Sequence, residues 1–404
     1  MGDLAQRNQP QDQCQIDLQA HRAQYSALAN KQYFNYGGQG PLAEVALGAI
    51  AAAYRKTQAL GPFSGAVNGW VAEVRQDLRQ AMAAELGCTA AAITLTEDVT
   101  VGCNIPLWGQ DWQPGDHILL SDCEHPGIIA TVQELQRRFG LEVSICPLMA
   151  TLNGGDPAAV IGDHLRPSTR LVVISHILWN TGQVLPLKAI MATCQGFEQA
   201  RQPVRVLVDA AQSVGVLPLD LTDLGVDYYA FTGHKWWCGP EGVGGLYVRP
   251  EIREALSPTY IGWRGILYGD RGQPAGWQPN GQRYEVATSA YPLYVGLQRA
   301  MEFQNQWGNA QARYDRLLAL SAQLWQQLQG IPAVTCLRQA APESGLVSFQ
   351  LGDRRHGELV RHLESQQIYV RQIADPDCVR ACVHYLTLEE EVAQLVGAIA
   401  QFCA

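Results

Sequence analysis

Between residues 40 and 285 the sequence alternates short apolar runs with segments long enough to form helices. The runs at 171–174 and 206–208 are apolar at every position, so strands formed there must be buried on both faces. Such strands occur in parallel sheets that helices cover on both sides. The pattern therefore predicts an α/β doubly wound fold, in which ligands bind beyond the carboxyl ends of the strands.

The alternation also predicts where the elements lie. The expected strands are 117–120, 143–146, 171–175, 204–208, 228–231 and 245–248, and the expected helices between them include 128–139 and 187–199. After residue 290 the pattern changes to a helical pair at 294–329, strands at 346–350, 368–370 and 379–385, and helices at 357–366 and from residue 388 onward. We therefore expect a large α/β domain of residues 31–288 and a smaller α+β domain of residues 1–30 and 289–404.

Composition narrows the classes of partner. A net charge of −9, without a run of Lys and Arg, argues against nucleic acid and anionic membranes. The chain has no stretch of about 18 apolar residues, and residues 1–7 are polar, so neither a membrane span nor a secretory signal is expected. Eleven irregularly spaced cysteines without a Cys-x-x-Cys pair indicate free thiols rather than disulfides or a metal site. We therefore expect a cytoplasmic protein that binds small molecules and other protein subunits and that contains no metal.

Two residues with complementary chemistry follow neighbouring strands. Asp209 ends the run 204–208, Lys235 follows the run 228–231, and 235 − 209 = 26 residues separate them. One strand–helix–strand unit fits this separation, so both side chains can reach one crevice. A lysine amine can form a Schiff base with a cofactor aldehyde, while a carboxylate keeps a pyridine nitrogen protonated. Taken singly, Asp209 is better explained as a helix cap and Lys235 as a solvated loop residue; together they favour the cofactor.

The motifs around this pair resemble class V of the fold-type I pyridoxal-phosphate (PLP) enzymes. They are Asp-x-x-Gln at 209–212, Thr-Gly-His-Lys at 232–235 and Gly-Pro-x-Gly-x-Gly at 239–244. The group includes cysteine desulfurases, kynureninases, isopenicillin-epimerase-like proteins and cysteine/cystine C–S lyases. The resemblance extends over residues 34–400, and among these enzymes the chain most resembles the cyanobacterial-type cysteine/cystine C–S lyases. The resemblance implies a mostly parallel seven-stranded sheet, a PLP cofactor held as a Schiff base on Lys235, and catalysis by Lys235 with His125.

The resemblance also implies how the cofactor is held. Asp209 would pair with the pyridine nitrogen, Gln212 would hydrogen-bond the phenolic oxygen, and His125 would stack on the ring, although a histidine after a strand is often structural. The residues implied to bind phosphate are Val99 and Thr100 at a helix N-terminus, Thr232, His234 and, across a homodimer with shared active sites, Thr288. A helix cap for Thr100 and an ordinary turn residue for Thr288 are the alternatives.

Substrate contacts are implied on both sides of the cavity. The segment 379–383 resembles the family's Val-Arg-x-Ser strand, whose arginine holds the substrate carboxylate by a planar two-point contact. Arg380 would take this role, and Arg371 would meet a second anionic group of a larger substrate unless it forms only a surface ion pair. The family often has an asparagine where simple alignment places Trp179, so Asn180, one step later, is the candidate for the substrate contact.

The sequence departs from cysteine desulfurases, which need a nucleophilic cysteine on a mobile loop well upstream of the arginine. Cys378 lies only two residues before Arg380, and Cys336 lies in an apolar setting, so we expect no persulfide step on the protein. This favours β-elimination from a small sulfur amino acid, cysteine or cystine, to give pyruvate, ammonia and sulfide or persulfide. Whether the sulfur goes to an acceptor for iron–sulfur clusters or the purpose is amino-acid breakdown stays open.

Three alternatives remain at this point. Within the family, the chain could be a cysteine desulfurase, an aminotransferase or an epimerase-like enzyme. A dinucleotide-binding dehydrogenase requires Gly-x-Gly-x-x-Gly after the first strand, and the glycine cluster at 239–245 follows the lysine instead. A PLP-fold protein that has lost catalysis and serves as a binding module is disfavoured because both Asp209 and Lys235 are present.

Overall fold

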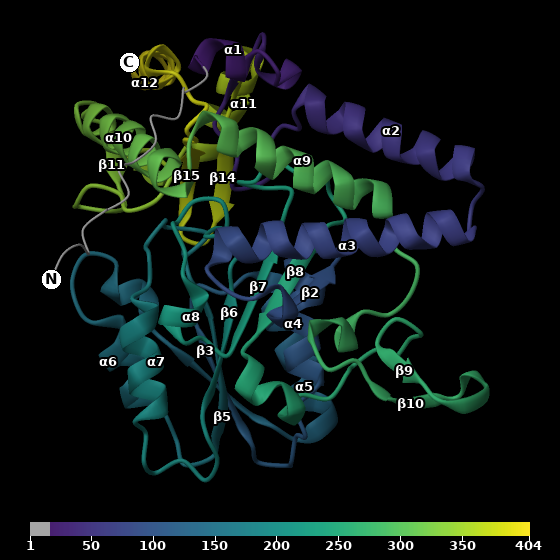
Figure 1. Ribbon diagram of the computed structural model, residues 1–404. Coiled ribbons are helices and arrows are strands. Elements are labelled where there is room, and N and C mark those ends of the chain that lie inside the picture. The colour runs from purple at the N-terminus through teal and green to yellow at the C-terminus, as the bar shows by residue number, and fades with distance from the viewer. Residues whose placement is uncertain (1–16) are drawn as a thin grey trace, which may run out of the picture.

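The computed structural model describes residues 17–404, and its centre is a seven-stranded sheet (Figure 1). The strands are β2 (Ile93–Thr96), β3 (His117–Ser121), β4 (Glu142–Cys146), β5 (Thr169–Ser175), β6 (Arg205–Asp209), β7 (Tyr228–Thr232) and β8 (Gly244–Val248). They lie in the order β2-β8-β7-β6-β5-β3-β4, and neighbours are parallel except that β8 runs antiparallel to β7 and β2. The predicted α/β fold with a mostly parallel sheet of seven strands is confirmed.

Helices cover both faces of this sheet. They are α3 (Gly65–Leu86), α4 (Val99–Trp108), α5 (Pro126–Phe139), α6 (Pro157–His164), α7 (Leu187–Gln195) and the single turn α8 (Leu221–Leu224). The predicted helix 128–139 is α5, which begins two residues earlier with a proline at its first position. The predicted helix 187–199 is wrong in its last four residues, because α7 ends at Gln195 and Gly196, a poor helix former, follows.

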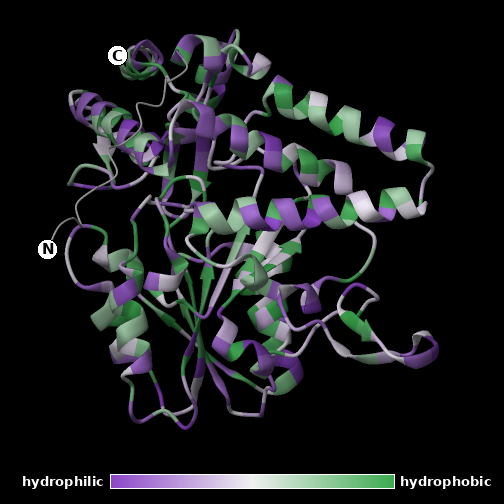
Figure 2. Ribbon diagram, in the orientation of Figure 1, coloured by the Kyte–Doolittle hydropathy of each residue, from purple (hydrophilic) through white to green (hydrophobic). Residues whose placement is uncertain are grey.

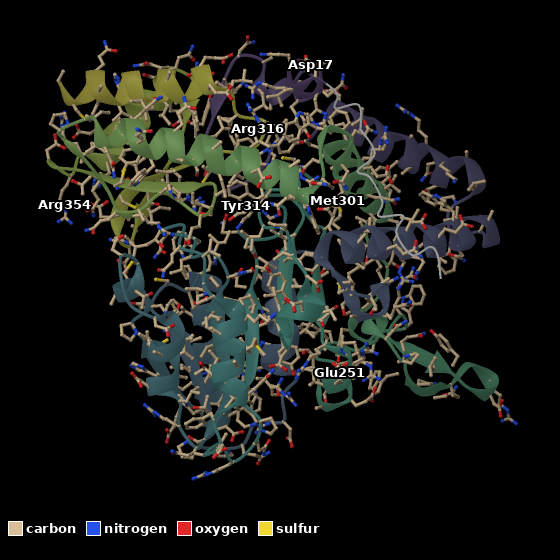
Figure 3. All side chains as sticks on the ribbon, turned by 60° about the vertical axis from the view of Figure 1, so that its left-hand side comes forward. Asp17, Glu251, Met301, Tyr314, Arg316 and Arg354 are labelled. Atoms are coloured by element: carbon tan, nitrogen blue, oxygen red, sulfur yellow. The ribbon has the colours of Figure 1, made fainter. Side chains whose placement is uncertain are left out.

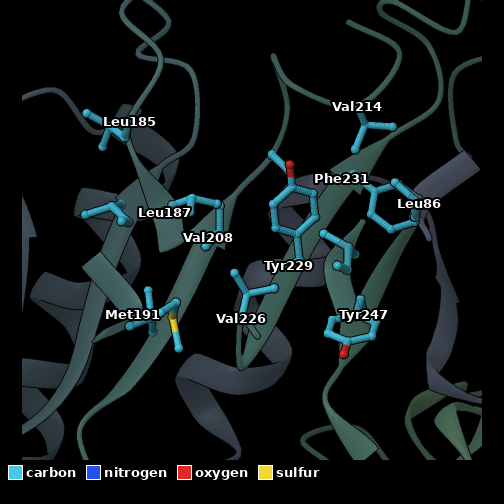
Figure 4. Close-up of a cluster of buried hydrophobic side chains, with 14 of the residues drawn as sticks. Leu86, Leu185, Leu187, Met191, Val208, Val214, Val226, Tyr229, Phe231 and Tyr247 are labelled. Carbon is cyan, nitrogen blue, oxygen red and sulfur yellow. The ribbon is translucent and has the colours of Figure 1, made fainter. Parts of the chain in front are cut away.

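Successive strand residues pack into opposite clusters. Val208 and Tyr229 belong to the cluster covered by α3, α6 and α7 (Figure 4), whereas Leu207 and Ala230 belong to the cluster covered by α4 and α5. Figure 2 shows the strands largely in hydrophobic colours, as the all-apolar runs of the sequence require. Apolar burial on both faces therefore fixes the central strands, and their polar residues are confined to the strand ends.

A second sheet lies in the C-terminal part of the chain. Its strands are β11 (Val334–Cys336), β12 (Leu346–Leu351), β15 (Asp377–Cys382) and β14 (Arg371–Ala374), in that order, all antiparallel. Its apolar face packs against α10 (Ala310–Gln329), α11 (His356–Ser365) and α12 (Glu389–Cys403). The predicted strand 379–385 is wrong beyond Cys382. The predicted strand 368–370 is β13 (Ile368–Tyr369), which pairs in parallel with β1 (Gln32–Tyr33) instead of joining this sheet.

The N-terminal segment is held against the C-terminal part. Arg22 of α1 (Leu18–Arg22) forms a buried ion pair with Glu391 of α12, 2.5 Å from Nη2 to Oε1. Arg316 of α10, labelled in Figure 3, donates to the carbonyl oxygen of Tyr385 at 2.9 Å. By contrast, α9 (Tyr291–Trp307) packs on α2 (Glu44–Leu60) and α3, and contributes Leu297 to the core of the large sheet. The domain division at residue 288 therefore stays a prediction.

Two further features complete the fold. The hairpin of β9 (Ile266–Tyr268) and β10 (Pro274–Trp277) projects away from the body of the molecule (Figure 1). Among residues 17–404, no helix combines the length and the apolar character needed to cross a bilayer.

Candidate active site

A cavity of about 190 Å³ lies where the carboxyl ends of β3, β5, β6 and β7 meet strands β14 and β15. This is the crevice at which ligands of doubly wound sheets gather. The predicted site residues that line it are Val99, Thr100, His125, Asp209, Gln212, His234, Lys235, Arg371 and Arg380. Three others, Asn180, Thr232 and Thr288, do not line it.

Lys235 and Asp209 face each other from neighbouring strand ends. Burial, with smaller contributions from Arg380 and Arg371, lowers the pKa of Lys235 to about 8, and Asp209 opposes this shift. Burial likewise raises the pKa of Asp209, against the pull of a hydrogen bond from the Ala211 amide at 2.9 Å and of Lys235. A buried carboxylate whose hydrogen bond comes from one backbone amide fits a cationic ring nitrogen, as PLP would supply.

The N-terminus of α4 forms another wall. The helix begins at Val99, and the side chain of Asp98 caps it by accepting from the Val101 amide at 2.8 Å. The amides of the first turn have no partner within the helix, so with the helix dipole they favour a phosphate group. The helix approaches the sheet closely at Gly102, where a Cβ would lie 3.0 Å from the Cβ of Ala230.

His234 and Thr232 act as a pair. The Oγ1 of Thr232 lies 2.6 Å from Nδ1 of His234, and the threonine is almost fully buried. Burial lowers the pKa of His234, with Lys235 adding to the shift. Thr232 therefore orients the His234 ring, and the ring is the part of the pair that lines the cavity.

His125 ends the turn between β3 and α5. Its Nδ1 accepts from the Gly127 amide at 3.2 Å, which leaves the ring proton on Nε2. Burial lowers the pKa of His125, so the ring is neutral near neutral pH. The ring meets that of Trp179 edge to face, with centroids 5.8 Å apart. His125 thus presents a neutral aromatic surface to the cavity.

Gln212 is held from two sides. Its Nε2 donates to the carbonyl oxygen of Gly37 at 2.9 Å, and its Oε1 accepts from the indole N–H of Trp236 at 2.9 Å. One N–H of the amide remains for an acceptor in the cavity. A Cβ at Gly37 would lie 3.0 Å from Gln212, Arg380 and Cys382, so glycine is needed where the N-terminal segment approaches the site.

The two arginines lie side by side on the second sheet. Arg371 of β14 and Arg380 of β15 are direct cross-strand partners. Arg380 is 1% exposed, and its Nη1 donates to the carbonyl oxygen of Trp179 at 2.5 Å, whereas its Nε and Nη2 have no partner in the described structure. Like charges opposite each other destabilise a sheet, and unpaired buried donors cost further free energy. Anionic groups in the cavity would relieve both.

Two predicted residues lie elsewhere. The side chain of Asn180 donates to the carbonyl oxygen of Asp375 at 3.2 Å, and it is its neighbour Trp179 that lines the cavity. Thr288 lies in a separate hollow of about 420 Å³ together with Trp263 and Tyr291.

Other residues of the cavity were missed by the sequence analysis. Gly37, Asp98 and Ser175 line it. The position of Ser175 at a predicted strand end was a usable signal for it, whereas nothing in the local sequence marks Gly37. None of the described cysteines lines the cavity; Cys336 and Cys378 are buried, and burial raises their pKa values to about 11 and about 12. Residues 17–404 contain no cluster of three metal-ligating side chains.

Comparisons with known proteins agree with one another. The family model for Aminotransferase class-V matches residues 47–396. A structure of a lysine-to-alanine variant of C-DES, with glycine covalently linked to its PLP cofactor, matches with a TM-score of 0.92 and 53% identity, covering 94% of this chain and 98% of that one. The complex of the cystine C–S lyase C-DES with its reaction product cysteine persulfide matches with a TM-score of 0.91 and 53% identity. This match covers 93% of this chain and 99% of that one. The cysteine desulfurase of Klebsiella pneumoniae (strain 342) is 29% identical over 326 residues, which are 77% of this chain and 78% of that protein.

Proposed function

The chain belongs to the class-V aminotransferase family, and we propose that it is a PLP-dependent carbon–sulfur lyase. It removes the β-sulfur of cysteine or cystine and yields pyruvate, ammonia and sulfide or persulfide. The observation that carries the proposal is one cavity that joins Lys235 to the paired arginines Arg371 and Arg380 and that none of the described cysteines lines. The similarity to the cystine C–S lyase C-DES supports the same chemistry.

Residues of this chain suit the cofactor. When bound, PLP supplies a protonated pyridine ring that accepts the electron pair left at Cα after the proton departs. We infer that Asp209 keeps the ring nitrogen protonated, because its buried carboxylate needs a cation. Val99 and Thr100 at the start of α4, with His234, would hold the phosphate. The free N–H of Gln212 would donate to the phenolic oxygen.

Lys235 serves as the base at Cα. Only a neutral amine can accept a proton, and a pKa of about 8 gives Lys235 a sizeable neutral fraction near neutral pH. Arg380 holds the α-carboxylate of the substrate with its unpaired Nε and Nη2 donors, which positions Cα for the transfer. His125 lines the same cavity and, because burial lowers its pKa, adds no positive charge.

The β-carbon–sulfur bond then breaks, and sulfur leaves as a thiolate from cysteine or as cysteine persulfide from cystine. The three-carbon remainder hydrolyses to pyruvate and ammonia. Sulfur transfer to the protein would require an accessible thiolate. Cys378 and Cys336 are buried thiols with raised pKa values, so the sulfur stays on the leaving group. The outer sulfur of cysteine persulfide would then pass to an external thiol acceptor, such as one that supplies iron–sulfur clusters, with cysteine as the leaving group.

The paired arginines favour cystine over cysteine. Cystine carries two carboxylates, and two guanidinium groups on adjacent strands of one cavity can each bind one. Arg380 would bind the carboxylate at the reacting Cα, because it is the buried member of the pair. Arg371 would bind the distal carboxylate, which cysteine lacks.

We also propose a homodimer with shared active sites. Thr288 lies outside the cavity of its own subunit, in a hollow with Trp263, and would reach the phosphate of the partner's cofactor. Tyr260 and Ile261 nearby are each 64% exposed, which is apolar surface that a second copy would cover. The cysteines of the described chain are free, which supports the cytoplasm as the place of action.

Product analysis tests the function directly. Purified protein with PLP should convert cystine to pyruvate and cysteine persulfide, and β-chloroalanine to pyruvate without sulfur release. Equimolar alanine instead of pyruvate from cysteine would indicate a desulfurase and contradict the proposal. A purified protein that shows no absorption band near the edge of the visible range after addition of PLP would contradict the cofactor assignment.

A further inference from the structure

Glu124 is a buried carboxyl group of the site that the mechanism above does not use. It lies in the turn between β3 and α5, directly before His125, and is 4% exposed. Its Oε1 accepts from the hydroxyl of Ser121 and from the Ser175 amide, the latter at 3.1 Å, and its Oε2 lies 2.9 Å from the Ser175 hydroxyl oxygen. Glu124 therefore links the carboxyl ends of β3 and β5 beneath the cavity.

These contacts suit a neutral carboxylic acid. Oε1 receives two donors, as the carbonyl oxygen of an acid does, while Oε2 contacts one hydroxyl. If Oε2 carries a proton, it donates to Ser175 Oγ, and the hydroxyl hydrogen of Ser175 is released toward the cavity that this residue lines. All three contacts are then satisfied without a charge.

The surroundings disfavour the ionised form. No ion pair within residues 17–404 includes Glu124. Burial, with a smaller contribution from the carboxylate of Asp209, raises the pKa of Glu124 to about 8, although the hydrogen bonds from Ser121 and Ser175 act in the opposite direction. The titratable groups that face it or adjoin it are Asp209 on β6, Cys103 on α4, Cys146 on β4, and Asp122, Cys123 and His125 in its own turn. Burial raises the pKa values of the three thiols, so they are neutral at the pH where Glu124 titrates, and the carboxylate of Asp209 is the charge that opposes its ionisation.

We propose that Glu124 is a positioning residue that works as a neutral acid: it fixes the turn carrying His125 and leaves Asp209 as the carboxylate that faces the cofactor ring. The inference rests on the proposed function for the role of Asp209. An ionised Glu124 would place a second carboxylate charge close to Asp209, without a cation of its own. Its proton therefore keeps the geometry of the site intact.

The inference fixes the direction of a pH dependence. The folded-state pKa of Glu124 is raised, from 4.5 to about 8, so between these values the folded protein holds a proton that the unfolded chain has lost. The stability that this proton contributes is complete below pH 4.5 and is lost as the pH rises to about 8. Glu124→Gln removes this dependence, because its amide oxygen can accept both donors and its amide nitrogen can donate to Ser175.

Infrared spectroscopy and unfolding test the inference without turnover. The difference spectrum of wild type minus Glu124→Gln should contain the C=O stretch of a protonated carboxylic acid at about pH 6 and lose it at about pH 9. The ratio of the unfolding constants, wild type over Glu124→Gln, should rise by up to about tenfold per pH unit between pH 4.5 and about 8 and stay constant above that. Glu198→Gln, the same change on the exposed surface, should show neither effect.

The pH profile of turnover gives a third readout. The kcat of wild type should fall above about pH 8 relative to that of Glu124→Gln, by about tenfold per pH unit in the limiting range. A difference spectrum without the acid band at about pH 6, or a pH-independent ratio of unfolding constants, would overturn the inference. A protein that shows the band but forms no pyruvate from cystine would contradict the proposed function and still support a neutral Glu124.

Discussion

The cavity has two walls that handle charge differently. On the wall made by the seven-stranded sheet, the carboxylate of Asp209 and the amine of Lys235 extend from adjacent strand ends and oppose each other's pKa shifts. On the wall made by β14 and β15, Arg371 and Arg380 are cross-strand partners, and neither forms an ion pair in the described structure. The first wall contains both signs of charge, and we call it the balanced wall. The second wall contains positive charge alone, and we call it the unbalanced wall.

This difference separates the two tasks of the site. The balanced wall belongs to the rigid sheet, whose interior is fixed by apolar packing, and it suits a cofactor that stays bound. The repulsion between the two arginines of the unbalanced wall is relieved when anionic groups bind to them. The binding free energy of a substrate at this wall therefore depends on how many carboxylates the substrate has. Catalysis should therefore depend mainly on the first wall, and substrate choice on the second.

The largest expected effect is on the balanced wall. Lys235→Ala should lower kcat for cystine by about 10⁴-fold or more, since it removes the base that takes the Cα proton. The substrate should still bind, because Arg380 is intact, and its binding can be followed by changes in the cofactor absorbance. Lys188→Ala, at an exposed ion pair with Asp223, is the matched control and should leave kcat unchanged. A Lys235→Ala enzyme whose kcat lies within tenfold of the wild-type value would contradict the role of Lys235 as the base at Cα.

Asp209→Asn should have the next largest effect. The amide oxygen can still accept from the Ala211 amide, so the change removes charge with little change of shape. Without that charge the ring nitrogen loses its proton, and kcat should fall by about 10³-fold while the protein stays folded. The pKa of Lys235 should also drop, because the carboxylate of Asp209 makes the largest contribution that raises it. Asp223→Asn on the surface serves as the control, and a loss below tenfold would contradict the role of Asp209.

The balanced wall was also the more predictable one. The runs 206–208 and 228–231 are apolar throughout, which predicts buried strands, and a polar residue just beyond the carboxyl end of such a strand lies at the ligand crevice. The apolar runs therefore predict where Asp209 and Lys235 lie, and their complementary chemistry as a pair predicts the cofactor. Six of the seven strands of the sheet follow for the same reason, whereas β2 was not predicted from the pattern and the number seven was implied only by the family resemblance.

The rest depended on contacts that no local pattern specifies. β13 pairs with β1 across more than 300 residues, so the run 368–370 looked like a member of the small sheet. Trp179 rather than Asn180 lines the cavity, and the Asn180 side chain donates to the carbonyl oxygen of Asp375, a residue 195 positions away. Glu124 stood beside His125 in the sequence, but its importance comes from Ser175 on another strand. Such residues are found only once the strands are placed side by side.

On the unbalanced wall, Arg380→Lys should have the largest effect. Lysine keeps the charge but cannot make the planar two-point contact, so kcat/KM should fall by about 10²-fold. The loss should be similar for cysteine and cystine, because both present the same α-carboxylate. Arg338→Lys, at a partly exposed ion pair of the same part of the chain, is the control. A loss confined to cystine would mean that the roles of the two arginines are reversed.

The smallest effect is the most selective. Arg371→Gln should raise KM for cystine by about tenfold, the loss expected for one charge-assisted contact at an exposed site. For cysteine, which lacks the distal carboxylate, kcat/KM should change by less than about twofold, and the relief of like-charge repulsion next to Arg380 offsets part of any loss. Steady-state kinetics with both substrates on one enzyme preparation measures the ratio directly. An equal loss of kcat/KM for both substrates would show that the unbalanced wall does not distinguish substrates by their number of carboxylates. The proposed separation of catalysis from substrate choice would then be wrong.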